Sequence, residues 1–225
     1  MLEPQNYTIK LWTDDDALKL IKSKYAWLLP TYMGYPHNIQ RADIARLLVV
    51  HTEGGIYADL DVYPRCAEHI QCLQHLDLEA IFSPTSGTLG LSNHFFMAER
   101  GSPLLQWVLY EAKRRGGGLT PRWMILPYLQ VFWSTGPIML TAAFKKYSWI
   151  YGTLRDFIGL LDEGYSGAVI RHAAGRSWHG VDGQALNYIA DHSQMGVQFK
   201  GFAYIGISLG IAFVGRRYYG RLSPR

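Results

Sequence analysis

The sequence has few cysteines and few charges, and it lacks several patterns that mark particular protein classes. Two cysteines in 225 residues exclude a disulfide-rich scaffold. The chain has no internal repeat, no low-complexity linker, no zinc-finger spacing and no concentrated basic arm, so a nucleic-acid partner is not expected. Charged residues make up 18% and hydrophobic residues 48% of the chain, which is typical of a globular protein. We therefore expect one α/β domain with a sizeable core.

Cysteine placement and net charge leave the cellular compartment open. Cys66 and Cys72 could form a disulfide in an oxidising compartment, and two free thiols are the alternative. Asn6-Tyr7-Thr8 is a glycosylation sequon, a motif that is frequent by chance. The net charge of +4 would suit a diphosphate ligand or an anionic membrane surface, but it does not choose between them.

The most informative segment runs from Arg41 to Asp61, RADIARLLVVHTEGGIYADLD. It reads as a helix over 41–51, a double-glycine stop, and a strand over 56–63 that Pro64 ends. Because side chains alternate along a strand, Asp59 and Asp61 should point the same way and form an oxygen site for Mg²⁺ or Mn²⁺. The same alternation would put Ile56, Ala58, Leu60 and Val62 on the other face.

Further elements follow from apolar patterns and caps. Residues 6–13 read as a strand with Tyr7, Ile9 and Leu11 on one face, and Thr13 should cap the helix that follows. Two more strands are expected over 78–84 and 92–99. Ser102-Pro103 should open a helix over 104–115, which three glycines end, and Ser134-Thr135-Gly136-Pro137 should precede a helix over 138–146.

A composite motif carries a resemblance to a known family. It consists of Ala42-Asp43, Arg46, the hydrophobic run 47–50, Gly54-Gly55-Ile56-Tyr57, and then Asp59 and Asp61. A lone pair of aspartates two residues apart has little value, but this combination resembles the DXD region of retaining glycosyltransferases with the GT-A fold. It is especially similar to fungal mannosyltransferases of glycosyltransferase family 32 and more distantly similar to the large clostridial glucosylating toxins.

The resemblance implies a fold and a set of roles. The fold would be a GT-A-like (Rossmann-like) α/β domain with a mixed sheet flanked by helices. Asp43 and Arg46 would hold hydroxyls of the donor sugar, although the pair at i and i+3 could also be a solvated helix pair. Asp61 would contact the metal directly, and Asp59 would meet the ribose or reach the metal through water. Tyr57, which shares their face, is included in the expected donor site.

Two further segments are similar to family elements. An Asn or Asp stands shortly before a strand of large apolar residues in such proteins, so Asn93 is a candidate near the donor sugar, with a turn residue or cap as the alternative. The family carries a Thr-Gly-Pro like Thr135-Gly136-Pro137. There a helix N-terminus could offer amides to substrate oxygens, or the segment could be a purely structural turn.

The C-terminal third supplies a third metal-ligand candidate. Many retaining GT-A enzymes return to the metal with a His, a turn and a Trp, and this chain has His172, Gly175 and Trp178 in that order. His172 could then complete a Mn²⁺ shell with the aspartates, while Trp178 would line the donor site. Arg176 could bind the diphosphate bidentately. His179 and Asp182 are rival ligands that the sequence does not separate from His172.

The two ends of the chain prompt two expectations. Family members normally carry an earlier strand that contacts the nucleotide base, and the first residues here do not resemble it. At the other end, Gly201–Gly215 is free of charge and is followed by four arginines. That run is shorter than the ~20 residues that span a bilayer. We expect a catalytic domain over 1–196 and a hydrophobic segment with a basic tail over 197–225, either a membrane anchor or a buried element docked on the domain.

Together these features predict a metal-dependent retaining glycosyltransferase that uses Mn²⁺ or Mg²⁺. By resemblance, it would transfer mannose from GDP-mannose to a membrane lipid such as inositol phosphoceramide, in the Golgi or another endomembrane. One alternative is a mannosyltransferase acting on protein N-glycans, and another is an inactive homologue that binds a sugar nucleotide or lipid. No side chain stands out as a catalytic base, which agrees with retaining transfer in which the leaving phosphate takes the proton.

Overall fold

The computed structural model describes residues 7–85, 90–117, 126–152, 157–173 and 182–184. Its centre is a four-stranded sheet in the order β1-β4-β3-β5. β4 pairs antiparallel with β1 and β3, and β3 pairs parallel with β5, so the carboxyl ends of β1, β3 and β5 meet at one edge. The strands are β1 (Gly55–Ala58), β3 (Ala80–Pro84), β4 (Leu91–Ala98) and β5 (Ile158–Leu160).

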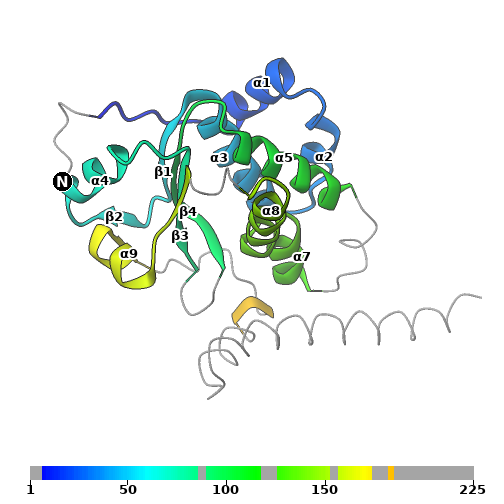
Figure 1. The fold of residues 1–225 in the computed structure, drawn as a ribbon. Coiled ribbons are helices and arrows are strands. Elements are labelled where there is room, and N and C mark those ends of the chain that lie inside the picture. The colour runs from blue at the N-terminus through cyan, green and yellow to red at the C-terminus, as the bar shows by residue number, and fades with distance from the viewer. Residues whose placement is uncertain (1–6, 86–89, 118–125, 153–156, 174–181, 185–225) are drawn as a thin grey trace, which may run out of the picture.

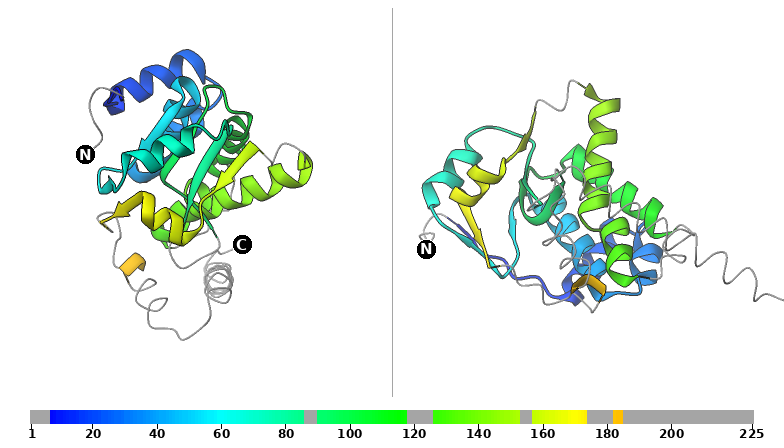
Figure 2. Two further views of the ribbon diagram at one scale, coloured as in Figure 1. Left: turned by 60° about the vertical axis from the view of Figure 1, so that its left-hand side comes forward. Right: turned by 90° about the horizontal axis from the view of Figure 1, so that it is seen from below.

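Helices cover both faces of this sheet, which confirms the expected GT-A-like α/β fold (Figure 1). One side carries most of the helices, and the other carries two helices and a small two-stranded sheet made of β2 and β6; two further views show the same layers (Figure 2). The first group is α1 (Asp14–Lys24), α2 (Leu29–Gly34), α3 (Asn38–Glu53), α5 (Pro103–Gly116), α7 (Pro127–Ser134) and α8 (Pro137–Ile150). The second is β2 (Val62–Pro64), α4 (Ala67–Gln74), α9 (Glu163–Val169) and β6 (Ile170–His172).

Strand alternation divides the core into two clusters, one on each face of the sheet. In β3, Phe82 belongs to the large cluster that includes residues of α3, α5 and α8, whereas Ile81 belongs to the smaller cluster with residues of α4. In β4, Phe96 faces the large cluster and stacks on Phe82 with 5.5 Å between ring centroids, while Phe95 faces the small one. A sheet that is covered on both faces needs apolar residues on both, and these strands supply them.

Local signals set several element ends where they were expected. The Thr13 side chain accepts a hydrogen bond from the Asp16 backbone and forms a capping box at the start of α1, and Ser102 caps α5. Gly54 ends α3 with φ of +73°, and a Cβ there would lie 3.0 Å from the Arg100 backbone nitrogen. Only glycine fits this position without strain, so the double glycine does stop the helix.

The predicted strand over 6–13 is wrong for its described part, because residues 7–13 belong to no strand. They run extended toward α1 and are tied to the domain by side chains instead. Tyr7 donates a hydrogen bond to Gln74 of α4, and the Lys10 ammonium lies 2.7 Å from a Glu53 carboxylate oxygen. Apolar alternation was present at Tyr7, Ile9 and Leu11, but no described strand offers these residues a partner.

Several elements were not predicted, and others extend further than expected. The helices α2, α4, α7 and α9 and the strands β5 and β6 are all short, and α8 runs on to Ile150. Cys66 and Cys72 lie at the start of α4 and within it as free thiols, so the disulfide alternative is wrong. Within the described ranges, no helix has the length and apolarity to cross a membrane. The expected anchor at 197–225 lies outside those ranges.

Candidate active site

The two DXD aspartates lie in one turn at the carboxyl edge of the sheet. β1 ends at Ala58, and the Val62 N–H donates to the Asp59 carbonyl at 2.9 Å, which closes a four-residue turn. The prediction of one strand over 56–63 is therefore wrong, and so is the alternation argument for the two carboxylates. Leu60 is 93% exposed at the turn rather than on a buried strand face. The aspartates remain near each other because the turn is tight.

Asp43 lies at the centre of a buried polar network. Its side chain is 7% exposed, and each carboxylate oxygen accepts a hydrogen bond from a different element. Asn93 in β4 donates its amide to Oδ1 at 2.9 Å, and the Thr135 hydroxyl donates to Oδ2 at 2.8 Å. The network thus joins α3, β4 and the junction of α7 with α8. The alternative of a solvated helix pair is wrong.

Arg46 connects this buried carboxylate to the DXD turn. Its side chain is 8% exposed, with Nη2 3.4 Å from an Asp43 oxygen and Nη1 2.9 Å from Asp59 Oδ1. Nη1 also donates to the Asn93 carbonyl at 3.1 Å, and the guanidinium lies over the Tyr57 ring at 4.9 Å. One cation therefore faces two carboxylates and an aromatic ring. The position of Asp59 is fixed by this contact.

Tyr57 and Asp59 are paired directly. The Tyr57 hydroxyl donates to Asp59 Oδ1 at 2.8 Å, and the Asp59 N–H donates to the His94 carbonyl in β4 at 2.8 Å. Burial raises the pKa of Tyr57 above its usual range, so this hydroxyl keeps its proton and remains a donor. Both bonds use Oδ1, and Asp59 Oδ2 has no partner among the described residues. That oxygen is available to a ligand.

Burial changes the ionisation of Asp43. Loss of hydration raises its pKa to about 6, while Arg46 and the hydrogen bonds from Thr135 and Asn93 oppose the rise. The pKa of Arg46 is raised: burial by itself would lower it, but Asp43, Tyr57 and Asp59 outweigh that effect. Near neutral pH the network therefore contains an ionised Arg46 and a mostly ionised Asp43, whose negative charge is largely shielded from water by protein groups.

The strand β6 places His172 beside the DXD turn in the fold. β2 pairs antiparallel with β6, with Val62 opposite His172, and the Ala173 N–H donates to the Asp61 carbonyl at 2.9 Å. The backbone of His172 therefore lies next to the residue that follows Asp61. This brings together two segments that are far apart in sequence, as the expected metal site requires.

Other predicted site residues fall elsewhere. Arg176, Trp178 and His179 lie outside the described residues. Asp182 accepts a hydrogen bond from the Tyr128 N–H at 2.8 Å, so its carboxylate caps the start of α7. Asp182, one of the rival metal-ligand candidates, therefore has a structural role at this helix start.

Sequence reasoning underrated some residues of the network and missed others. Thr135 was noted within a Thr-Gly-Pro element but not as a partner of Asp43. Gln40 was not considered, although it precedes Asp43 by three residues and so shares its helix face. Its amide donates to the buried Ser134 hydroxyl at 2.6 Å, next to Thr135. The sequence did contain a signal for Gln40, because it is a polar residue one helical turn before Asp43.

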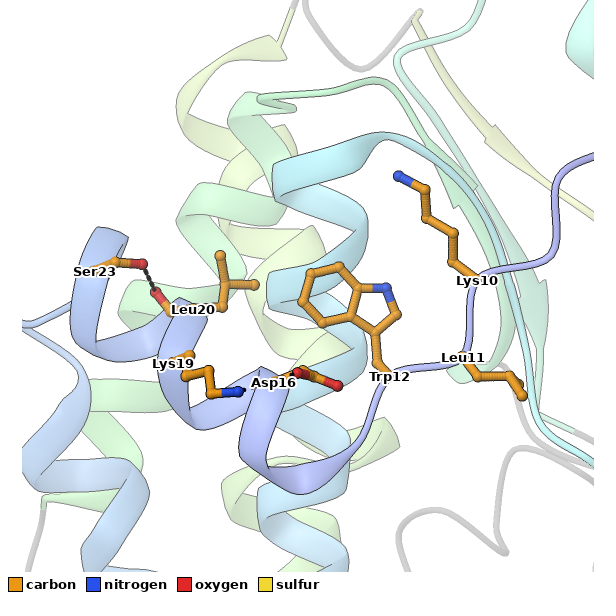
Figure 3. A pocket seen from close by; sticks show the side chains of 7 residues that line it. All are labelled: Lys10, Leu11, Trp12, Asp16, Lys19, Leu20 and Ser23. Carbon is orange, nitrogen blue, oxygen red and sulfur yellow. Dashed lines mark hydrogen bonds and ion pairs between the residues drawn. The ribbon is translucent and has the colours of Figure 1, made fainter.

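Two hollows lie near these elements. One, of about 550 Å³, is lined partly by Gln40 and Ser134, next to the Asp43 network. The other, of about 590 Å³, is an open groove between residues 10–12 and α1 (Figure 3). In Figure 3 the Trp12 ring lies between Lys10 and Leu20. This groove lies at the far end of α3 from Asp43, because Lys10 is bound to Glu53, the last residue of that helix.

The residues at the turn fit a hard divalent cation in type but do not by themselves complete its shell. The described residues contain no group of three or more His, Cys, Asp or Glu side chains placed to hold a metal. Asp59 offers Oδ2, and Asp61 is a half-buried carboxylate in the same turn. Oxygen ligands of this kind suit Mg²⁺ and Mn²⁺, which keep waters or take substrate phosphates as the remaining ligands.

Comparison with known proteins agrees with this geometry. Residues 1–76 match the family described as a glycosyltransferase sugar-binding region containing a DXD motif. The chain is 30% identical over 214 residues to inositol phosphoceramide mannosyltransferase 1 of Schizosaccharomyces pombe. The aligned region covers 93% of this chain and 64% of that protein. It is also 30% identical over 191 residues to the mannosyl phosphorylinositol ceramide synthase SUR1 of Saccharomyces cerevisiae. That aligned region covers 83% of this chain and 47% of the relative.

The chain thus spans less than two thirds of the length of these curated relatives. The matched family segment nevertheless includes the network residues of α3 and the whole DXD turn. The comparisons confirm the resemblance that the motif between Asp43 and Asp61 indicates, because residues 1–76 of this chain match a glycosyltransferase sugar-binding region containing a DXD motif.

Proposed function

We propose that the chain is a metal-dependent retaining mannosyltransferase that uses GDP-mannose and transfers mannose to an inositol phosphoceramide-type lipid in a Golgi or other endomembrane. One observation carries the proposal: a single buried arginine, Arg46, holds both the buried Asp43 and the DXD residue Asp59 at the carboxyl edge of the sheet. Ligands of open α/β sheets bind at that edge. The relatives' printed names supply the lipid acceptor.

The donor would lie between the turn and the buried network. Asp59 Oδ2 and the Asp61 carboxylate would hold a divalent cation, and His172 is the candidate for a further ligand. A bound Mn²⁺ or Mg²⁺ would neutralise the diphosphate as charge develops on it during departure of the leaving group. The Arg46–Asp59 contact fixes the direction of the carboxylate before any ligand arrives, so little reorganisation is needed.

Asp43 would orient the donor sugar. A carboxylate has about four acceptor positions, and Asn93 and Thr135 use one on each oxygen. The remaining positions suit sugar hydroxyls, for which the ionised form is the better acceptor. No described side chain near the turn is placed as a general base, which is consistent with transfer in which the departing phosphate accepts the proton of the incoming hydroxyl.

A panel of nucleotide sugars, with and without Mn²⁺, tests this proposal. The purified full chain should release GDP from GDP-mannose only when the cation is present. Asp61→Ala should abolish that release and leave the circular dichroism spectrum unchanged. Asp15→Ala, which removes an exposed carboxylate in the first turn of α1, is the matched control and should retain full turnover.

Four results would contradict parts of the proposal. Turnover by Asp61→Ala at the parental rate would exclude the metal assignment. Release from another nucleotide sugar but not from GDP-mannose would exclude the donor. Binding of GDP-mannose without any release would favour the alternative of an inactive sugar-nucleotide-binding homologue. Transfer to a protein N-glycan in place of the lipid would exclude the acceptor.

A further inference from the structure

The two-stranded sheet next to the DXD turn has an outer face that no described element covers. Tyr63 and Arg171 are cross-strand partners in the ladder of β2 and β6, so their side chains share one face. Tyr63 is 51% exposed, and Arg171 is also exposed. Their neighbours Val62 and Ile170 point to the opposite face and are buried.

The inner face is fully used for packing. Val62 and Ile170 belong to one hydrophobic cluster with Ile70 and Leu73 of α4, so α4 lies under the inner face. The outer face therefore points away from the domain. Figure 1 shows β2 and α9 on the side of the sheet that faces away from α5 and α8. The packing of the domain therefore does not account for the exposed tyrosine and arginine.

The outer face and its surroundings combine apolar and cationic groups. Leu60 is 93% exposed in the turn that leads into β2. Arg65 follows β2, is exposed, and like Arg171 forms no ion pair with a described residue. The nearest elements carry carboxylates too: Glu68 of α4 accepts a bond from Cys66, Asp162 caps α9, and Glu163 lies in the first turn of α9. We define the outer ribbon face as Leu60, Tyr63, Arg65 and Arg171.

We propose that the outer ribbon face rests on the headgroup region of an anionic phospholipid membrane. The inference depends on the proposed function, because a lipid acceptor must reach the DXD turn from a bilayer. Tyrosine is a typical residue of the membrane interface, and each arginine near an anionic surface contributes electrostatic attraction. Leu60 would enter the apolar boundary beneath the headgroups. Contact by this face would place Asp59 and Asp61 at the membrane surface.

A second exposed apolar patch is a natural competitor, and its position argues against it. Trp149, which is 85% exposed, ends α8 together with Ile150, and Phe157 precedes β5. Ile158 pairs with Ala80 at the start of β3, so this patch lies at the amino ends of the parallel strands. Docking there would hold the DXD turn at the end of the domain that is away from the lipid.

A pair of fluorescent labels separates the two orientations without any measurement of activity. The free thiols of the full chain are first removed by Cys66→Ser and Cys72→Ser. Tyr63→Cys and, as the matched control, Trp149→Cys are then labelled with an environment-sensitive fluorophore. The chain is mixed with phosphatidylcholine vesicles with or without phosphatidylinositol, some containing brominated lipid as a quencher.

With phosphatidylinositol vesicles, the label at residue 63 should shift to the blue and be quenched by brominated lipid, and the label at residue 149 should show neither change. A response at residue 149 alone, or at neither position, would overturn the proposal. So would a label at residue 63 that is already shielded before vesicles are added, because the face would then be covered by the chain itself. Addition of free inorganic phosphate should not reverse the shift, since the proposed ligand is the bilayer.

A second measurement separates this inference from the proposed function. Tyr63→Ser with Arg171→Ser should lower transfer to vesicle-embedded lipid by about fivefold or more, the contribution of one cation at an anionic membrane. The same protein should hydrolyse GDP-mannose at the parental rate in the absence of lipid. Trp149→Ser with Lys145→Ser removes the same two residue types, one aromatic and one cationic, at the far end of the sheet and should change neither rate. Equal transfer rates for the two double variants would contradict the proposed membrane contact. Failure of the parent chain to hydrolyse GDP-mannose would instead contradict the proposed mannosyltransferase function.

Discussion

The candidate site has two halves that differ in almost every physical respect. The buried half consists of Asp43, Arg46, Asn93 and Thr135, which come from three separate parts of the chain and satisfy one another within the protein. The open half consists of the DXD turn and β2, where Leu60 and Tyr63 face solvent. Asp59 belongs to both, because Arg46 holds one of its oxygens.

The difference indicates a division of labour. A buried charge network is costly to disturb, since removal of one partner leaves an uncompensated charge or polar group. A turn at the surface contributes little to stability and can accept ligands. We therefore expect substitutions in the buried half to lower the free energy of unfolding, and substitutions in the open half to affect function with little change in stability. The following predictions test that contrast.

The largest loss of stability should follow Arg46→Ala. This change leaves Asp43 and Asp59 without their shared cation, and loss of one partner in a buried ion pair costs about 4 kcal/mol in the free energy of unfolding. Lys10→Ala, which breaks the exposed pair with Glu53, is the control and should cost less than about 1 kcal/mol. Urea unfolding of both variants measures the difference, and similar values would contradict a special role for the buried pair.

The pH dependence of stability should reveal the buried carboxyl group. The pKa of Asp43 is raised to about 6 in the folded protein, so the folded state binds a proton more tightly than the unfolded chain. The contribution of the protonated Asp43 carboxyl group to stability is complete below pH ~4 and is lost as the pH rises through about 6. Relative to Asp43→Asn, the free energy of unfolding should fall by roughly 3 kcal/mol across that range.

Chemical unfolding at a series of pH values measures this fall, because the other titrating groups cancel in the comparison. A constant difference between the parent and Asp43→Asn would mean that the carboxyl group is not buried in the folded protein. A difference that increased with pH would mean that the Arg46 charge outweighs burial and lowers the pKa.

A smaller loss should follow Thr135→Val. The change keeps the shape of the side chain but removes the hydroxyl that donates to Asp43 Oδ2, which costs about 2 kcal/mol for a bond to a charged group. Thr85→Val is a close control, because the buried Thr85 hydroxyl has no hydrogen-bond partner among the described residues. That control should be neutral or slightly stabilising. An equal loss of unfolding free energy in Thr135→Val and Thr85→Val would show that the hydrogen bond to Asp43 does not contribute to stability.

The smallest effect is expected for Leu60→Ser. A side chain that is 93% exposed buries almost no surface, so its loss should change the free energy of unfolding by less than about 0.5 kcal/mol. A larger loss, measured by the same urea titration, would mean that the turn is part of the folded core. The contrast between the two halves would then not hold.

Sequence reasoning recovered features that are set locally. The caps at Thr13 and Ser102 and the stop at Gly54 depend on residues within one turn of the chain, and the structure confirms all three. The composite motif also identified Asp43, Arg46 and Asp59 as one group, and the structure brings them together. Local chemistry was sufficient for the two caps and the stop because the deciding atoms are neighbours in sequence.

The errors arose where distant segments decide the conformation. The pattern IYADLDVY alternates well enough for one strand, but the second half leaves the main sheet to pair with β6, more than a hundred residues further along the chain. The contact between Asn93 and Asp43 is likewise long-range, and no local rule pairs them. The alternation of Tyr7, Ile9 and Leu11 failed for the opposite reason, because no described strand pairs with it.

The hydrogen bond from Ala173 to the Asp61 carbonyl has a consequence for biosynthesis. A ribosome produces the strand that flanks the DXD turn more than a hundred residues after the turn itself. Contacts of such large sequence separation form late in folding. A nascent chain would therefore form the pairing of β1 with β4 before the DXD turn acquires its final neighbour, and premature termination before residue 170 would leave that turn without β6.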